Sequence, residues 1–258
     1  MQATAVVTKA KMDTLQKIHI WAARSGWIFT AGFLFAVLPW FGGGIPPMLK
    51  PTDTPEAVWA FYSGQKYWVL AGAWIGMSAS AFYYVWGGAI AAMLRRTEYG
   101  RPPILTYTQL GAVGVAVFNS VLYFFVMAWV GFRVETMDPK MIQHLNDFLF
   151  IQLEFEVFPL SLWAVAMGLS ILLDKSKDPV MPRWVAWANF WYAGLVMSGQ
   201  FMIFFKSGPA AWNGVLAVYW PAFVFFTWLC IMSSQMVKAI KKYDYAAGEA
   251  RANLEVYT

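Results

Sequence analysis

Long apolar stretches, bounded by charged residues, proline or glycine, dominate the hydropathy pattern of the chain. A bilayer core about 30 Å thick is crossed by a helix of about 20 predominantly apolar residues. The alternating apolar and polar pattern that marks a membrane β-barrel is absent. The pattern therefore predicts an all-α, polytopic membrane helix bundle with six transmembrane helices, over residues 18–41, 67–94, 107–132, 148–173, 184–205 and 214–237.

The composition agrees with this class. Apolar residues make up 59% of the chain and charged residues 13%, whereas a soluble domain has about 45–50% and about 25%. Too few ionised side chains are present to cover a surface that faces water, which excludes an ordinary soluble domain. No long polar linker divides the chain, so we expect a single transmembrane domain over residues 1–258.

Two polar connections between the apolar stretches carry signals for short helices. We expect interfacial helices in the outer loops near residues 54–64 and 139–147. In the first, Asp53 or Thr54 can cap a helix that has Pro55 at its first position. Aromatic residues in this loop would favour the membrane interface.

The basic residues predict the orientation, because cytoplasmic loops carry an excess of Lys and Arg. With both termini cytoplasmic, most of the 19 Lys and Arg residues fall on the inner side. The net charge of +5 is then a signal of topology and gives no reason to expect a nucleic-acid partner. We expect a multi-pass protein of the bacterial inner (cytoplasmic) membrane, whose outer side holds only Lys50, Lys66, Arg133, Lys140 and Lys206.

Several kinds of chemistry are excluded by the residues present. Cys230 is the single cysteine, so no intrachain disulfide and no two-cysteine redox mechanism can form. The two histidines, His19 and His144, belong to opposite ends of the predicted bundle, which excludes a bis-histidine haem. The sequence contains no P-loop, GxSxG or HExxH pattern. We therefore predict no metal site, no catalytic residue and no cofactor.

Two carboxylates in the fourth apolar stretch are the most unusual feature. Counted from Asn146 at about 1.5 Å per residue, Glu154 and Glu156 lie roughly 12 Å and roughly 15 Å from the outer end of the helix. Ionised acids at the centre of a membrane helix cost about 2.5–3.5 kcal/mol and normally face a protein interior or a cavity. The two side chains differ by about 200° around the helix, so at most one faces a central site. Pro159 can kink the helix beside them.

Other polar residues suggest two groups of candidate ligand-binding residues. One group lies at a depth comparable to Glu154 and Glu156 and consists of Ser78, Asn119 and Gln200. The second group lies nearer the outer surface and consists of Asp147, Lys206, Trp212 and Asn213. Lys206 in this group could pair with Glu154. These polar groups either form a ligand or proton site or pair with one another to fix the register of the helices.

Aromatic residues are abundant, with 15 Trp, 12 Tyr and 21 Phe. They could line a pocket for a flat lipophile, and a bound lipid, quinone, sterol or carotenoid would suit such a pocket. They could equally be anchors that face the lipid.

Four short segments give the chain a family resemblance: TYTQLG at 106–111, LND at 145–147, MPRW at 181–184 and FFKSGPAAWNG at 204–214. Together they resemble a family of small bacterial six-helix integral membrane proteins of unknown function, over roughly residues 25–242. The resemblance implies a six-helix membrane fold. It implies no activity, cofactor or catalytic residue, but it draws attention to the second group of candidates.

The leading hypothesis is a non-catalytic membrane protein that binds a lipophilic ligand or serves as an accessory subunit of a larger membrane complex. The alternative is a small oligomeric transporter with a polar pathway through Glu154 or Glu156. A third hypothesis, an enzyme acting on a lipid, lacks an evident nucleophile. The expected partners are membrane lipids and either another membrane protein or further copies of the chain.

Overall fold

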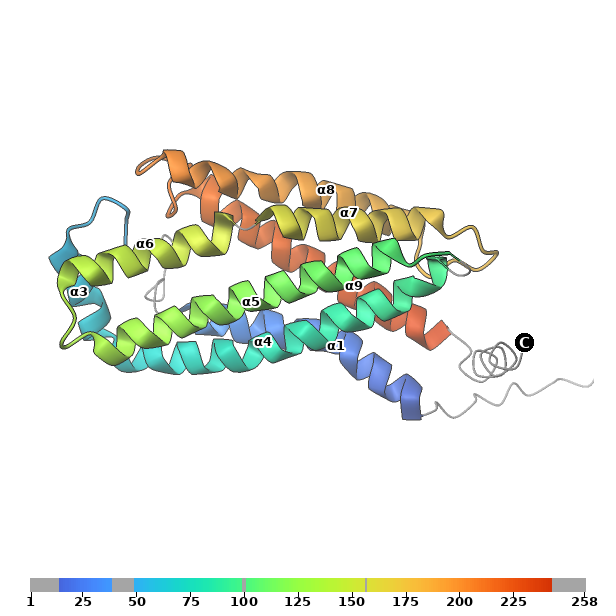
Figure 1. Ribbon diagram of the computed structural model, residues 1–258, viewed down its shortest axis with the longest axis horizontal. Helices are drawn as coiled ribbons and strands as arrows, with labels where there is room; N and C mark the ends of the chain where they lie inside the picture. The colour runs from blue at the N-terminus through green and yellow to red at the C-terminus, as the bar shows by residue number, and fades with distance from the viewer. Residues whose placement is uncertain (1–13, 39–48, 99–100, 156, 243–258) are drawn as a thin grey trace, which may run out of the picture.

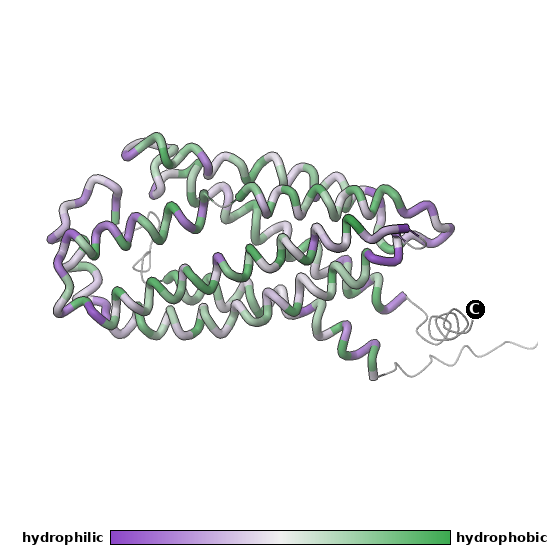
Figure 2. Tube along the Cα trace, in the orientation of Figure 1, coloured by the Kyte–Doolittle hydropathy of each residue, from purple (hydrophilic) through white to green (hydrophobic). Residues whose placement is uncertain are grey.

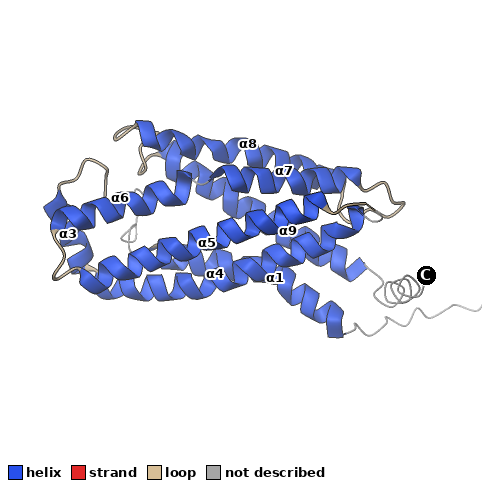
Figure 3. Ribbon diagram, viewed as in Figure 1, coloured by secondary structure: helices blue, strands red, loops and turns tan. Residues whose placement is uncertain are grey.

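The computed structural model describes residues 14–38, 49–98, 101–155 and 157–242. These residues form helices and short connections without a strand (Figure 3). The predicted all-α class is therefore confirmed. The helices are α1 Thr14–Ala36, α3 Pro55–Gly64, α4 Lys66–Arg95, η1 Arg96–Glu98, α5 Ile104–Arg133, α6 Pro139–Phe155, α7 Val157–Leu173, α8 Arg183–Leu195, η2 Val196–Phe204, η3 Val215–Tyr219 and α9 Trp220–Lys242.

Within the described residues, four helical segments are long and apolar enough to cross a membrane: Lys66–Glu98, Ile104–Arg133, Pro139–Leu173 and Val215–Lys242. The chain thus has the helices of a membrane protein.

The other two predicted spans, residues 18–41 and 184–205, are not among these four segments. The prediction for residues 18–41 runs beyond the described part of α1, and α8 changes to a 3₁₀ helix after 13 residues. The six-span count stays a prediction. The predicted cytoplasmic termini, residues 1–13 and 243–258, lie outside the described residues.

The helices form one elongated bundle (Figure 1). Helix α4 packs against α1 and α5, α7 packs against α8 and α5, and α9 packs against α1. The α4–α5 and α7–α8 connections lie at one end, whereas α3 and the connection from α5 to α6 lie at the other. Hydrophilic residues gather at the two ends and hydrophobic residues occupy the middle (Figure 2). This distribution is the one expected of a bundle that lies across a bilayer.

Small residues on α4 allow the neighbouring helices to approach closely. Gly76 faces the ring of Phe124 on α5, and a side chain at Gly76 would overlap that ring. One turn further on, the hydroxyl oxygens of Ser80 and Ser120 lie 2.7 Å apart. The spacing of small residues that favours helix association is therefore used here between helices of one chain.

Helix α3 closes one end of the bundle. Thr54 is its N-cap, and the threonine hydroxyl accepts a hydrogen bond from the Ala57 amide at 3.3 Å. The indole of Trp59 donates to the carbonyl of Val134 at 2.9 Å, just after α5. The phenol of Tyr62 donates to the side-chain oxygen of Asn146 on α6, also at 2.9 Å. These contacts fix the end of α5 and the middle of α6 to the same short helix.

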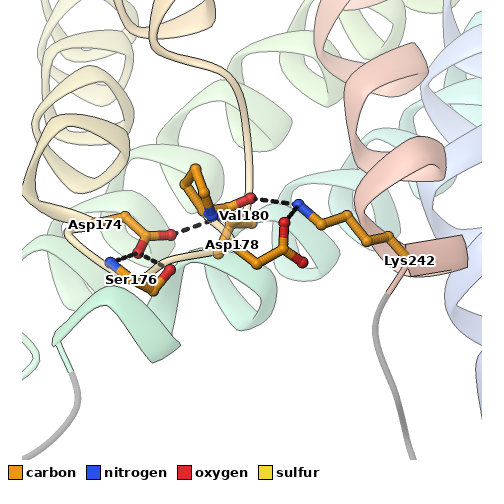
Figure 4. Close-up of polar contacts among 6 residues, drawn as sticks. Asp174, Ser176, Asp178, Val180 and Lys242 are labelled. Atoms are coloured by element: carbon orange, nitrogen blue, oxygen red, sulfur yellow. Dashed lines mark hydrogen bonds and ion pairs between the residues drawn. The ribbon is translucent and has the colours of Figure 1, made fainter.

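At the other end, Asp174 organises the connection from α7 to α8 (Figure 4). Its carboxylate accepts hydrogen bonds from the amide and hydroxyl of Ser176 at 3.1 and 2.6 Å and from the Val180 amide at 2.7 Å. Burial favours the neutral acid, but these hydrogen bonds together outweigh it and lower the pKa of the Asp174 carboxyl below its ordinary value. Lys242, at the end of α9, joins the same connection by an ion pair with Asp178.

Candidate functional site

The fourth predicted span, residues 148–173, lies within one helical segment, Pro139–Leu173, whose described parts are α6 and α7. Helix α6 continues past the predicted boundary at residues 147 and 148. The expected separate helix at 139–147 is thus the first part of a longer one, because no helix-breaking residue lies near Asp147. Glu156, one of the two candidate carboxylates, lies between α6 and α7 and outside the described residues.

Pro159 leaves a backbone carbonyl at the end of α6 without its helical hydrogen-bond donor. Proline has no amide hydrogen, so the carbonyl of Phe155, four residues earlier, loses its helical donor. Gln200 of η2 supplies a replacement: its side-chain amide donates to the carbonyls of Phe155 at 2.9 Å and Glu154 at 3.1 Å. The side chain of Gln200 therefore stabilises the end of α6 from a neighbouring segment.

Two irregular segments lie near the end of α6, and one of them, η2, packs directly against it. Residues 196–204 form a 3₁₀ helix, although such helices rarely exceed three or four residues. Residues 215–219 form a π-helical turn before Pro221, and the Trp220 amide donates five residues back to the carbonyl of Val215. The hydroxyl of Ser198 joins these segments by donating to the carbonyl of Leu216 at 2.9 Å. Such irregular backbone is tolerated at membrane depth where it is buried in protein or lines a cavity.

A cavity of about 160 Å³ lies beside these segments and is partly open. Its wall is built by α1, α4, α5, α6, α7, α8, η2, η3 and α9, and it is almost entirely apolar. Glu154 is the one ionisable carboxylate among the described lining residues, and Asn119 and Ser120 add polar groups. Its aromatic lining consists of Phe29, Phe33, Tyr83, Tyr123, Phe150, Tyr192, Phe225 and Phe226.

The side chain of Glu154 is 8% exposed and lines this cavity. No hydrogen bond or ion pair joins its carboxylate to any residue that the structure describes. The predicted pairing with Lys206 is therefore not observed. Gly199 leaves the room that the carboxylate occupies, since a β-carbon there would lie 2.9 Å from Oε2 of Glu154.

The other predicted residues at this depth divide between the cavity and the surface. Asn119 lines the cavity, and its backbone carbonyl accepts a hydrogen bond from Gln152 at 2.9 Å. Gln200 is buried next to the cavity wall and donates to the Phe155 carbonyl at the end of α6. Ser78 is exposed and donates to the carbonyl of Trp74 on its own helix. It turns away because it is about 200° around α4 from the inward-facing Ser80.

Three residues of the second predicted group, Asp147, Lys206 and Trp212, come together beside the middle of α6. The indole of Trp212 and the side chain of Lys206 lie close enough to the half-buried carboxylate of Asp147 to interact with it. Trp212 is buried and stacks on Phe150 at a ring distance of 4.0 Å. Since Phe150 also lines the cavity, this stack connects the second predicted group with the cavity wall. Asn213 is partly exposed beside Trp212.

The aromatic wall was not predicted residue by residue. Phe29 and Phe33 are four positions apart on α1, and their common face was a signal in the sequence. Phe29 stacks on Tyr83 of α4 at 4.2 Å, and Tyr192 of α8 stacks on Trp228 of α9 at 4.3 Å. No sequence pattern indicates which helices bring their aromatic faces together.

Neither a metal centre nor a known relative guides the assignment of this site. Within the described ranges, no group of three or more His, Cys, Asp and Glu residues could hold a metal ion. Comparison of the chain with models of protein families, with curated proteins and with solved structures finds no match in any of the three. The family resemblance thus stays a prediction, and the function has to be inferred from the cavity.

Proposed function

We propose that the chain is an integral membrane protein that binds a small lipophilic molecule in the cavity beside Glu154. The observation that carries the proposal is an apolar, aromatic-lined cavity of about 160 Å³ with a single buried carboxylate on its described wall. Ligand sites are typically of this kind: mostly apolar, with a few polar groups that fix orientation.

The size of the cavity indicates the size of the bound group. An apolar cavity of about 150 Å³ in another protein accepts a benzene-sized molecule and stays dry without one. Most of the wall here is likewise apolar. A lipophilic group of about that size would replace lost packing contacts and remove apolar surface from water, which stabilises the complex.

The proposal includes the setting of the protein. It is a multi-pass protein of the bacterial inner membrane, surrounded by lipids, that acts alone, as a homo-oligomer or as an accessory subunit of a larger complex. The distribution of basic residues supports a cytoplasmic position for the end that holds the α4–α5 and α7–α8 connections (Figure 1), since these connections and their edges carry Arg95, Arg96, Arg101, Lys175, Lys177 and Arg183.

Native mass spectrometry of the gently extracted protein tests ligand binding. We expect a small molecule to remain bound to the wild-type chain at a defined stoichiometry. Ala116 is buried and lines the cavity, so Ala116→Phe should fill part of the cavity and abolish retention. Val115 on the same helix is 40% exposed, so Val115→Phe is the matched control and should retain the molecule.

Two results would contradict the proposal. One is a wild-type protein that carries no molecule besides exchangeable bulk lipid and detergent. The other is a bound molecule that is retained equally by Ala116→Phe and Val115→Phe, since it would then lie elsewhere. A folded Ala116→Phe protein, shown by an unchanged helical circular dichroism spectrum, is required for the comparison.

A second candidate function, a small oligomeric transporter, is favoured by the two irregular segments η2 and η3. Binding sites in many transporters are formed by discontinuous membrane helices near the middle of the bilayer, and η2 and η3 supply irregular backbone beside one cavity. Flux through proteoliposomes separates the two functions. Transport of the retained molecule that is lost in Glu154→Gln supports a transporter, whereas binding without flux supports a binding protein.

A further inference from the structure

We propose that the cavity recognises a positively charged alkylammonium group, held between the aromatic rings and the carboxylate of Glu154. This inference rests on the proposed function and specifies the chemical class of its ligand: a small lipophilic cation. Three properties of the cavity support it, namely its charge, its aromatic wall and its size.

The acidic group of the cavity has no counter-charge among the described lining residues. Glu154 is more than nine-tenths buried and faces the cavity without a hydrogen bond or ion pair from the described residues. None of the described lining residues is Lys, Arg or His. A carboxylate in a membrane interior normally pairs with a cation or another polar group. A cationic ligand would provide that pair inside the cavity.

The aromatic wall provides the second feature of a cation site. Phe29, Tyr83, Tyr123, Tyr192 and Phe225 come from five different helices and surround the same space. The negatively polarised faces of aromatic rings attract alkylammonium groups, and the attraction increases where water is excluded. Such groups are held in proteins by cages of several aromatic residues.

The adjacent rings are fixed by mutual contacts, so the wall is preorganised. Phe29 stacks on Tyr83 at 4.2 Å and meets Phe225 edge-on at 6.4 Å. Tyr83 also meets Phe225 edge-on, at 6.2 Å. A preorganised site loses less side-chain freedom when its ligand binds.

The cavity size and chemistry disfavour other ligands. A volume of about 160 Å³ suits a compact head group, and the opening leaves space for an attached apolar chain. A neutral lipophile would fill the same volume but leave the buried carboxylate unpaired. An anionic amphiphile would place two negative charges together in a medium of low dielectric constant.

Binding of radiolabelled butyltrimethylammonium to the protein in nanodiscs tests this inference. Unlabelled butyltrimethylammonium and its uncharged carbon isostere, 2,2-dimethylhexane, serve as competitors, with empty nanodiscs as the blank. We expect the cation to compete at least about tenfold better than the isostere, as expected for a desolvated cation–π and carboxylate site. Glu154→Gln should weaken binding of the cation by at least about tenfold, and Glu154→Asp should retain part of it.

The matched control is Glu56→Gln, which removes an exposed carboxylate on α3 and should leave binding unchanged. Equal competition by the cation and the isostere would overturn the ammonium assignment but leave the proposed lipophile site intact. Full binding of the cation by Glu154→Gln would overturn it in the same way. If neither molecule binds and no native ligand is retained, the proposed function fails as well. The comparison of two ligands on the wild-type protein remains decisive even if Glu154→Gln does not fold.

Discussion

Gln200→Leu tests the proposed role of Gln200 as a hydrogen-bond donor to the end of α6. In the wild-type protein the side-chain amide of Gln200 donates to the carbonyls of Glu154 and Phe155 at 3.1 and 2.9 Å. Leucine has a similar volume and no donor, and the Phe155 carbonyl has no helical alternative because residue 159 is proline. A buried acceptor that loses its partner costs about 1–3 kcal/mol.

The net effect should fall within that range. The side-chain oxygen of Gln200 is itself buried without a hydrogen-bond partner in the described structure, and its removal offsets part of the loss. Gln152→Leu is the matched control, since Gln152 donates to the Asn119 carbonyl within the uninterrupted helix α5. Its loss should cost about 0.6 kcal/mol, the average for such bonds between membrane helices.

A double-mutant cycle with Pro159→Ala makes the test specific. Alanine restores an amide hydrogen that can donate to the Phe155 carbonyl, so Gln200→Leu should cost less than about 1 kcal/mol in that background. The free energy of unfolding in mixed micelles, measured for all four proteins, gives the coupling. An equal cost of Gln200→Leu with proline and with alanine at residue 159 would refute the explanation.

Three further predictions concern packing, pH and surface charge, each measured by the free energy of unfolding. Gly76→Ala should lower the free energy of unfolding by about 1–3 kcal/mol, because the added β-carbon meets the ring of Phe124 on α5. Gly114→Ala is the control: the added β-carbon enters open space, so this change should raise the free energy of unfolding by up to about 1 kcal/mol. Asp174→Asn should cost about 1 kcal/mol near pH 7. Because folding lowers the pKa of this carboxyl, the difference should vanish as the pH falls through that pKa and persist at higher pH; a difference that grows in acid would contradict it. Lys66→Gln should leave the free energy of unfolding nearly unchanged, since its ion pair with Glu135 lies at the surface, and a clear loss of stability would contradict that view.

The sequence was sufficient for the helical class and for the position of Glu154 within a helix, because both depend on local properties. Apolar length predicts helices in a bilayer, and the rise per residue places a carboxylate within one. The direction in which a side chain faces was harder to predict. Helix α4 is apolar on all sides, so the pattern did not distinguish the inward-facing Ser80 from the exposed Ser78.

The role of Gln200 and the cavity wall depend on contacts between distant residues. Pro159 indicated a kink, but the role of Gln200 requires η2 to lie against the end of α6. In the same way, Phe29 and Tyr83 form one wall only because α1 packs against α4. The period of a single helix carries no information on its neighbours, so the cavity was not predictable from local patterns.

The central claim is that the cavity beside Glu154 holds a ligand in the membrane. A density map of the wild-type protein in native-lipid nanodiscs, at a resolution that shows side chains, tests it most directly. The account predicts compact non-protein density within contact distance of Glu154 and the rings of Phe29, Tyr83 and Tyr192. Side chains that close the cavity, or an open cavity without density, would contradict it.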